Sequence, residues 1–406
     1  MRFILTLAAV ALLATPALAQ VAPPTHAELA RLDRITARTP IIDGHNDLPW
    51  AIRDDHGNDL ANVDLNSDTR QLSPPLHTDI PRLRAGRVGA QFWSVYVPAS
   101  LRGADATQAV NEQIALTRRM IEAYPETFEF AQSAADIVRI HRAGRIASML
   151  GMEGGEAIQS NLDILRDFRR QGVLYMTLTH STTIDWVDSA TAAPQHGGLS
   201  PFGEEVIREM NRIGMLVDLS HVSAEAMRDA LRVTRAPVIF SHSSAFGVTP
   251  HPRNVPDDVL ELVRRNRGVV MVNFFPAFTS TEVWQWGAAR TGEQARLQSL
   301  NPGNPDAVTA GVAAWVAANP RPQIDASEIA DHIEHIARIA GRGAVGLGAD
   351  YDGVPFLPVG MEGVDGYAIL FAELMRRGWS DRDLAGLAGD NLLRALREAE
   401  RVARWR

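Results

Sequence analysis

The chain has 406 residues, and its 48 acidic residues outnumber its 40 basic residues, which gives a formal net charge of −8. No basic stripe offsets this charge, so nucleic acid is excluded as the expected partner. Cysteine is absent, which excludes disulfides, thiolate zinc sites and a cysteine nucleophile. Lysine is absent too, so a carbamylated lysine between two metal ions is excluded and any bridging ligand must be a carboxylate.

The first residues have the composition of a secretory signal peptide over 1–19. A charged start precedes an apolar run, Phe3–Leu13, and a small-residue segment, Pro16–Gln20. This pattern predicts cleavage after Ala19 and an exported protein, periplasmic or secreted. A membrane anchor is the alternative, but it needs about 20 apolar residues. We expect residues 20–406 to form a single domain without a stable membrane anchor.

Apolar runs then alternate with stretches of helical period, after a short lead-in helix at Thr25–Arg38. Most runs are rich in Val, Ile, Leu and Met without strict alternation, as is typical of buried parallel strands. The eight runs are Pro40–Asp43, Ala90–Val97, Ile146–Met152, Leu174–Thr179, Leu216–Ser220, Pro237–Ser241, Val269–Phe274 and Ala344–Gly348. The main helical segments are Ile137–Ala143, Leu162–Arg170, Glu204–Ile213, Ala224–Val233, Asp257–Asn266 and Ile329–Ala340.

Eight strand–helix units predict an α/β fold, a (β/α)8 TIM barrel. An open doubly wound sheet is the structural alternative, but its ligand site lies at one switch point. Two segments exceed ordinary loop length, Arg53–Leu83 and Pro276–Gln323, and we expect both to be long active-site loops that shape the barrel mouth.

Six candidate metal ligands fall at or just after the C-terminal ends of predicted strands, where barrel enzymes place their sites. They are His45, Asp47, Glu153, His221, His242 and Asp350. Zn²⁺ accepts imidazole nitrogen and carboxylate oxygen, and two ions about 3.5–4 Å apart can hold one hydroxide as the nucleophile. The pattern predicts a metal-dependent hydrolase.

Two of the carboxylates have neighbours that compete for the same role. Glu153 is the natural bridge between two ions, and its rival Glu156 follows a glycine pair and is expected to begin the next helix. Asp350 is a candidate proton shuttle as well as a candidate ligand. It can accept the proton of the nucleophile and return it to the leaving nitrogen. Asp352 precedes a glycine and is typical of a turn.

Two further residues are candidate catalytic groups rather than ligands. His180 follows the fourth strand, where it can donate a hydrogen bond to an oxygen that gains charge. Arg253 follows the sixth strand and can bind a carboxylate, although a surface ion pair is the alternative. His332 and His335 are expected to be solvated on an outer helix.

The chain resembles the membrane dipeptidase (renal dipeptidase) family, a branch of the amidohydrolase-like barrels, from about Pro40 to Leu396. Several motifs in the right order carry the resemblance: Asp43–Trp50, Phe92–Tyr96, Glu153–Gly155, Leu178–His180, Asp218–His221, Ser241–Ser243, Arg253–Asn254, Met271–Phe274, and Asp331–His335 running into Gly348–Gly353.

The resemblance implies two zinc ions per chain. It implies that His45, Asp47 and Asp350 serve one ion, that His221 and His242 serve the other, and that Glu153 bridges them. His180 would then bind the scissile carbonyl oxygen, and Arg253 the C-terminal carboxylate of the substrate.

The expected activity is therefore that of a zinc dipeptidase acting on small dipeptides, L,L and also L,D, by attack of metal-bound hydroxide. The alternatives are an amidohydrolase of N-acyl amino acids, lactams or cell-wall D-amino-acid fragments, and a non-catalytic binding protein. Phe275 stands where better-known members carry Tyr, which leaves the fine substrate preference open. The oligomeric state is also open, a homodimer being one option.

Overall fold

The computed structural model describes residues 21–403 of the chain. The predicted signal peptide and its cleavage site lie outside the described residues. Between residues 21 and 403, no helix is long and apolar enough to cross a membrane.

Eight parallel strands close into a barrel, as the sequence predicts. Their order around the barrel is β2-β1-β9-β8-β7-β6-β5-β4, and β2 pairs with β4 to close it. The barrel strands are β1 (Ile41–Asn46), β2 (Val88–Tyr96), β4 (Ile146–Glu153), β5 (Val173–Thr177), β6 (Leu216–Asp218), β7 (Ile239–Phe240), β8 (Val269–Val272) and β9 (Val345–Leu347). The prediction of a (β/α)8 TIM barrel is confirmed.

One additional short strand, β3 (Phe128–Phe130), lies outside the predicted set. It pairs with the first residues of β4, whereas β5 pairs with β4 from Leu150 onward. β3 therefore extends one edge of the barrel at the start of β4 and does not alter its closure.

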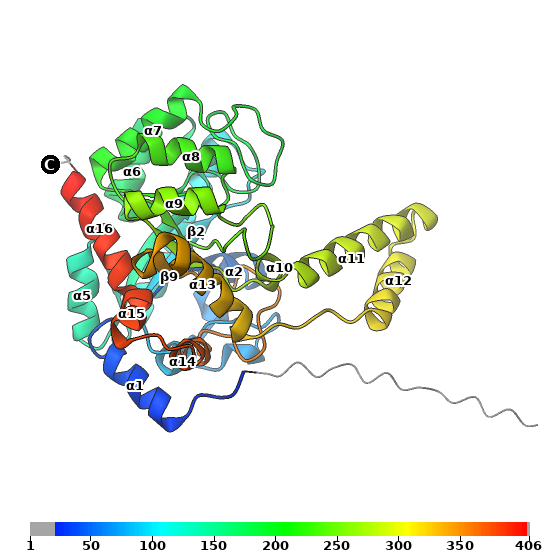
Figure 1. The fold of residues 1–406 in the computed structure, drawn as a ribbon. Coiled ribbons are helices and arrows are strands. Elements are labelled where there is room, and N and C mark those ends of the chain that lie inside the picture. Colours follow the sequence, from blue (N-terminus) through cyan, green and yellow to red (C-terminus); the bar gives the residue numbers. More distant parts are fainter. Residues whose placement is uncertain (1–20, 404–406) are drawn as a thin grey trace, which may run out of the picture.

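The chain between residues 21 and 403 also forms helices, most of which surround the barrel (Figure 1). They are α1 (His26–Thr36), α2 (Leu48–Asp55), α3 (Ile80–Ala85), α4 (Gly103–Ala123), α5 (Ala134–Arg142), α6 (Leu162–Arg170), α7 (Pro201–Ile213), α8 (Ala224–Val233), α9 (Asp257–Asn266), α10 (Pro276–Thr279), α11 (Thr281–Leu300), α12 (Pro305–Ala318), α13 (Ala326–Ala340), α14 (Tyr367–Arg376), α15 (Asp381–Ala385) and α16 (Asn391–Val402). The bounds of α6, α8 and α9 agree with the prediction. In α8, the Ser223 side chain caps the first turn and Met227 turns toward the core.

The expectation of a long loop at Pro276–Gln323 is wrong, because this segment forms α10, α11 and α12. The last two helices pack on each other and project from the barrel as a hairpin (Figure 1). Val283 of α11 and Val312 of α12 are their buried residues. Val283 and Trp284 in the first turn of α11 pack on the barrel. Most other side chains of the hairpin are exposed or half-buried, so its helices need no wide apolar stripe and the periodic signal is weak.

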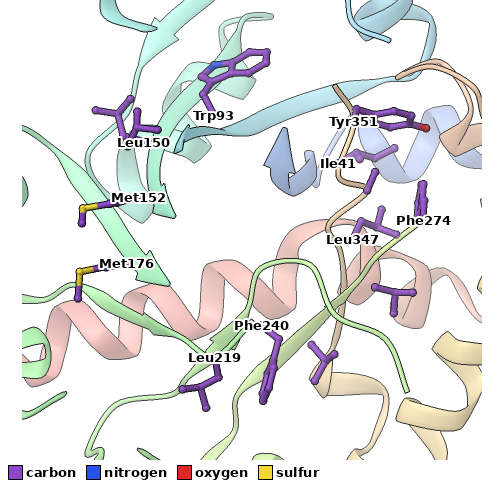
Figure 2. Close-up of a cluster of buried hydrophobic side chains, with 14 of the residues drawn as sticks. Ile41, Trp93, Leu150, Met152, Met176, Leu219, Phe240, Phe274, Leu347 and Tyr351 are labelled. Carbon is purple, nitrogen blue, oxygen red and sulfur yellow. The ribbon is translucent and has the colours of Figure 1, made fainter. Parts of the chain in front are cut away.

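Apolar side chains fill two layers, one on each face of the barrel strands. Along β4, Ala147 and Met149 belong to one cluster, and Ile146 and Leu150 belong to the other. Figure 2 shows members of the larger cluster, contributed by strands around the whole barrel. Because side chains alternate along a strand, Glu153 shares the face of Ala147 and Met149 and points into the barrel.

Candidate metal centre and active-site cavity

The six predicted ligands converge at the C-terminal mouth of the barrel. His45 lies in β1, Glu153 is the last residue of β4, and the others follow β1, β6, β7 and β9 directly or within three residues. All six are buried, with at most 8% of each residue exposed. A cavity of about 510 Å³ opens above them and is lined by Asp47, Glu153, His180, His221, His242, Arg253 and Asp350, among others.

Glu153 lies between His45 on one side and His221 and His242 on the other. Its Oε1 atom is 2.9 Å from Nε2 of His221 and 3.3 Å from Nε2 of His242. Its Oε2 atom is 3.5 Å from Nε2 of His45. One carboxylate thus presents an oxygen to each half of the site, which is the arrangement that a bridging ligand requires.

The other half of the site joins His45 to two carboxylates. Nε2 of His45 lies 3.2 Å from Oδ2 of Asp47 and 4.0 Å from Oδ1 of Asp350. Asn273 donates a hydrogen bond of 2.8 Å to the other oxygen of Asp350. Oδ1 of Asp47 is buried and has no hydrogen-bond partner within residues 21–403. This unpartnered oxygen, among imidazole nitrogens and carboxylates, fits a divalent metal ion.

Burial controls the charge of the histidines of the second half. It lowers the pKa of His221 and of His242 well below the usual value. Both imidazoles are therefore neutral near pH 7, and neutral imidazole is the form that binds a metal ion.

In the absence of metal, the charges of His45, Glu153 and Asp350 depend on one another. Burial opposes the charge of His45, but Asp47, Tyr175 and Glu153 outweigh it and raise its pKa. Burial also opposes the charge of Glu153, yet the nearby imidazoles hold its pKa well below its usual range. Burial raises the pKa of Asp350 to about 7 against the opposing charge of His45.

Two of the candidate ligands have a left-handed backbone. The φ angles are 71° at His221 and 69° at Asp350. Non-glycine residues rarely adopt this conformation, and it persists where the surroundings fix it, most often at functional sites.

His180 lies at the edge of the same cavity. Its ring centroid is 4.3 Å from that of His221, and its Nε2 atom is 3.9 Å from Oε1 of Glu153. Burial lowers its pKa, so the ring is neutral near pH 7 and can donate one hydrogen bond.

Arg253 is buried beside the ligands, not paired on the surface. It is 2% exposed, and its guanidinium donates long bonds of 3.4 Å to the Ser243 hydroxyl and to the His242 carbonyl. Its Nε atom has no hydrogen-bond partner among the residues that the structure describes. Within the described chain no carboxylate lies within 4.0 Å of it. Burial lowers its pKa to about 10, so it remains charged at neutral pH.

The expectation that His332 is solvated is wrong. His332 is fully buried, where its Nδ1 atom accepts a bond of 3.0 Å from the Ala245 amide and its Nε2 atom lies 3.1 Å from the Thr279 carbonyl. His335 lies 2.7 Å from Asp257 and is mostly covered. The helix packs against the loop after β7, so the face that carries His332 is internal.

The competing carboxylates lie apart from this cluster of ligands. Glu156 lies in a short 3-10 helix, Gly155–Ile158, as expected for a residue that begins the next helical turn. Asp352 has a left-handed backbone and accepts a bond of 2.6 Å from the His77 amide. From the Arg53–Leu83 segment, Asp55 lines the cavity, and His77 contacts Asp352, which also lines it.

Sequence reasoning missed the groups behind the histidines. The Tyr175 hydroxyl lies 3.0 Å from Nδ1 of His45, and the Ser241 hydroxyl lies 2.8 Å from Nδ1 of His242. Asp218 accepts a hydrogen bond from the Ser241 hydroxyl. Ser241 and Asp218 lie next to candidate ligands in the sequence motifs, which was a usable signal, whereas Tyr175 carries none.

A closed parallel barrel with buried histidines and carboxylates at its C-terminal mouth defines the class of metal-dependent (β/α)8 enzymes. The family model of the membrane dipeptidases (peptidase family M19) matches residues 29–405, and the chain belongs to this family. The family that the motifs indicate, one of peptide-bond hydrolases, is therefore confirmed.

A mammalian relative supports the same assignment. Dipeptidase 3 from Rattus norvegicus is 39% identical over 368 residues, which cover 89% of this chain and 66% of the rat protein. The chain thus spans just under two thirds of the length of that relative.

Two solved structures share the fold. The probable dipeptidase PvdM from Pseudomonas aeruginosa has a TM-score of 0.76 at 22% identity, covering 93% of this chain and 99% of its own. A metallo peptidase from Rhodobacter sphaeroides, liganded with a phosphinate mimic of the dipeptide L-Ala-D-Ala, has a TM-score of 0.71 at 23% identity. That match covers 89% of this chain and 99% of the other.

Proposed function

We propose that the protein is an exported zinc dipeptidase with two metal ions, which hydrolyses dipeptides that have a free C-terminal carboxylate. The observation that carries the proposal is the position of Arg253. A buried, charged guanidinium that has no carboxylate partner among residues 21–403 faces the same cavity as Glu153 and the histidines. An anionic group of the substrate is the partner that its charge requires.

The metal ligands divide into two sets with one shared member. His45, Asp47 and Asp350 would hold one zinc ion, and His221 and His242 would hold the other. Glu153 would bind both, which is supported by its two oxygens facing the two halves of the site. The bound ions would supply Lewis-acid charge and lower the pKa of the attacking water.

The protein side chains supply the rest of the chemistry. His180 donates a hydrogen bond to the scissile carbonyl oxygen as negative charge develops there. Asp350 accepts the proton of the attacking water and passes it to the leaving amine. Asp350→Asn should reduce kcat by about 10²- to 10⁴-fold, and full turnover with both metals bound would refute the shuttle role.

Arg253 also accounts for the length of the substrate. The guanidinium lies beside the ligands, so a carboxylate bound to it belongs to the residue next to the scissile bond, and a longer peptide would place an uncharged amide there. L,D dipeptides are included because the Rhodobacter sphaeroides protein was liganded with a mimic of L-Ala-D-Ala.

The alternative is an amidohydrolase of N-acyl amino acids, lactams or cell-wall D-amino-acid fragments, many of which also offer Arg253 a carboxylate. Zinc-loaded protein should be assayed on L-Ala-L-Ala, L-Ala-D-Ala and N-acetyl-L-alanine. We expect cleavage of dipeptides, loss of activity on chelation and recovery on adding zinc. Cleavage of N-acetyl-L-alanine without cleavage of either dipeptide would favour the alternative.

A further inference from the structure

Two of the three candidate histidine ligands are backed by buried hydroxyl groups. Each presents Nε2 to the ligand cluster and Nδ1 to a hydroxyl oxygen: Tyr175 for His45 at 3.0 Å, and Ser241 for His242 at 2.8 Å. A hydroxyl can either donate to an imidazole nitrogen or accept from it. If the hydroxyl donates its single proton to another group, the imidazole nitrogen that faces it must carry the N–H, and this determines the tautomer.

The Tyr175 hydroxyl donates its proton to a main-chain carbonyl oxygen. The hydroxyl lies 3.0 Å from the Gly44 carbonyl oxygen, which can only accept. Tyr175 therefore donates to Gly44 and accepts from Nδ1–H of His45. The barrel interior is shaped around this ring, because a Cβ atom at Gly151 would collide with it.

The Ser241 hydroxyl donates its proton to a carboxylate. Its hydroxyl lies 2.6 Å from Oδ2 of Asp218, and the Ser220 hydroxyl is farther away, at 3.4 Å. Two oxygens at 2.6 Å need a proton between them, since facing lone pairs would repel. The hydroxyl therefore donates to Asp218 and accepts from Nδ1–H of His242.

Asp218 is held as an acceptor by three other donors. The backbone amides of Ser220 and Ser241 donate to Oδ1 at 3.1 and 2.8 Å. The Thr177 hydroxyl lies 2.5 Å from Oδ2. Asp218 is fully buried, so these bonds replace the water that an exposed carboxylate would have.

We propose that Tyr175 and Ser241, the latter supported by Asp218, are positioning residues that hold His45 and His242 as their Nδ1–H tautomers. Each Nε2 atom is then the nitrogen that binds the metal, and any proton that it carries in the metal-free protein leaves on binding. Hydrogen bonds to the second ring nitrogen of a ligand are a general means of orienting it. This inference rests on the proposed function, since it assumes that the cluster binds metal.

The third histidine provides an internal contrast. Nδ1 of His221 is buried without a hydrogen-bond partner in the described part of the chain, so no hydroxyl there selects its tautomer. The positioning effect is therefore specific to His45 and His242, one in each half of the proposed site.

The test compares zinc affinity in Tyr175→Phe and Ser241→Ala with that of the unmodified protein, by competition with a chromogenic chelator. Each variant should weaken one of two zinc sites by about 10- to 100-fold. The matched controls are Tyr124→Phe, which removes a tyrosine hydroxyl far from the site, and Ser148→Ala, which removes a buried β4 hydroxyl without a partner. Melting of the metal-free proteins shows whether a variant has lost its fold.

A second readout follows the tautomer itself. In zinc-loaded protein with ¹⁵N-labelled histidine, NMR should show protonated Nδ1 for His45 and His242, and Tyr175→Phe should perturb the His45 signal alone. Wild-type zinc affinity in both folded variants, or equal loss in the controls, would overturn the inference. An unmodified protein that binds no zinc would overturn the proposed function, and this inference with it.

Discussion

The Nε2 atoms of His221 and His242 lie 2.8 Å apart in a buried part of the barrel mouth. Two imidazole nitrogens at this distance repel each other unless a proton or another cation lies near both lone pairs. Burial lowers the pKa of both rings, so each carries a single proton near pH 7, and a neutral His221 can donate its proton from Nε2 to Nε2 of His242. The proposed metal ion, held by these two nitrogens and Oε1 of Glu153, would replace that hydrogen bond.

Removing the shared carboxylate should weaken both halves of the site. Glu153→Gln keeps the shape of the side chain but replaces one oxygen with an amide nitrogen that cannot ligate a metal ion. We expect zinc affinity to fall by more than about 100-fold, beyond the loss typical of an outer-shell partner. Zinc content after dialysis measures the effect.

Glu156→Gln is the matched control for that variant, because Glu156 is also buried but lies outside the cluster of ligands. It should keep two zinc ions. If the Glu156 variant lost zinc and the Glu153 variant kept it, the assignment of the bridge would be reversed.

His180→Ala should separate catalysis from metal binding. The lost hydrogen bond to the developing oxyanion should reduce kcat by about 10²- to 10³-fold, with two zinc ions still bound. His180 has a nitrogen within 4.8 Å of ligand atoms of Glu153 and His221, so a fall in zinc content would instead identify it as a ligand.

His332 should make the fold sensitive to acid. Burial lowers its pKa from 6.5 to about 4, so between these values the unfolded chain binds a proton that the native protein does not. Stability from this group is present above pH 6.5 and is lost as the pH falls toward 4, by at most about 3 kcal/mol. Urea unfolding of metal-free protein and of His332→Gln should show a stability difference that shrinks with falling pH. A constant difference would contradict this.

The α11–α12 hairpin should be dispensable for folding. The Trp286 indole donates to the Asn319 carbonyl at 2.8 Å, so the two ends of the hairpin lie close together. Replacing residues 287–318 with a short Gly-Ser linker should change the melting temperature by less than about 4 °C and leave dipeptide kcat/KM nearly unchanged. A large loss of activity would show that the hairpin shapes the mouth after all.

The barrel was predictable because its strands are short apolar runs that alternate with stretches of helical period, and three helices agree with the predicted bounds. The missed strand β3 has three residues, one of them Glu129, too few to give a pattern. The hairpin was missed because helices that mostly do not pack on a core show no clear apolar stripe. α4 has buried Val110 and Ile114 at helical spacing, a signal that was present but unused.

In the candidate site, the ligands at the ends of strands could be predicted from the sequence. The residues that form hydrogen bonds to those ligands could not. Strand alternation and barrel geometry bring His45 and Glu153 together without further information. Tyr175 and His332 depend on contacts between segments far apart in the chain, which no local pattern encodes. The burial of Arg253 likewise follows from tertiary packing, and residue type alone could not separate it from a surface ion pair.

The most direct test of the central claim measures how Arg253 selects its substrate. Hydrolysis of L-Ala-L-Ala and of its C-terminally amidated analogue should be compared in zinc-loaded protein and in Arg253→Met. The proposal predicts that the unmodified protein prefers the free acid by about 100-fold or more, and that the preference collapses in the variant, with both zinc ions retained. An amide cleaved as fast as the acid, or a preference unchanged in Arg253→Met, would contradict a dipeptidase that recognises its substrate through this residue.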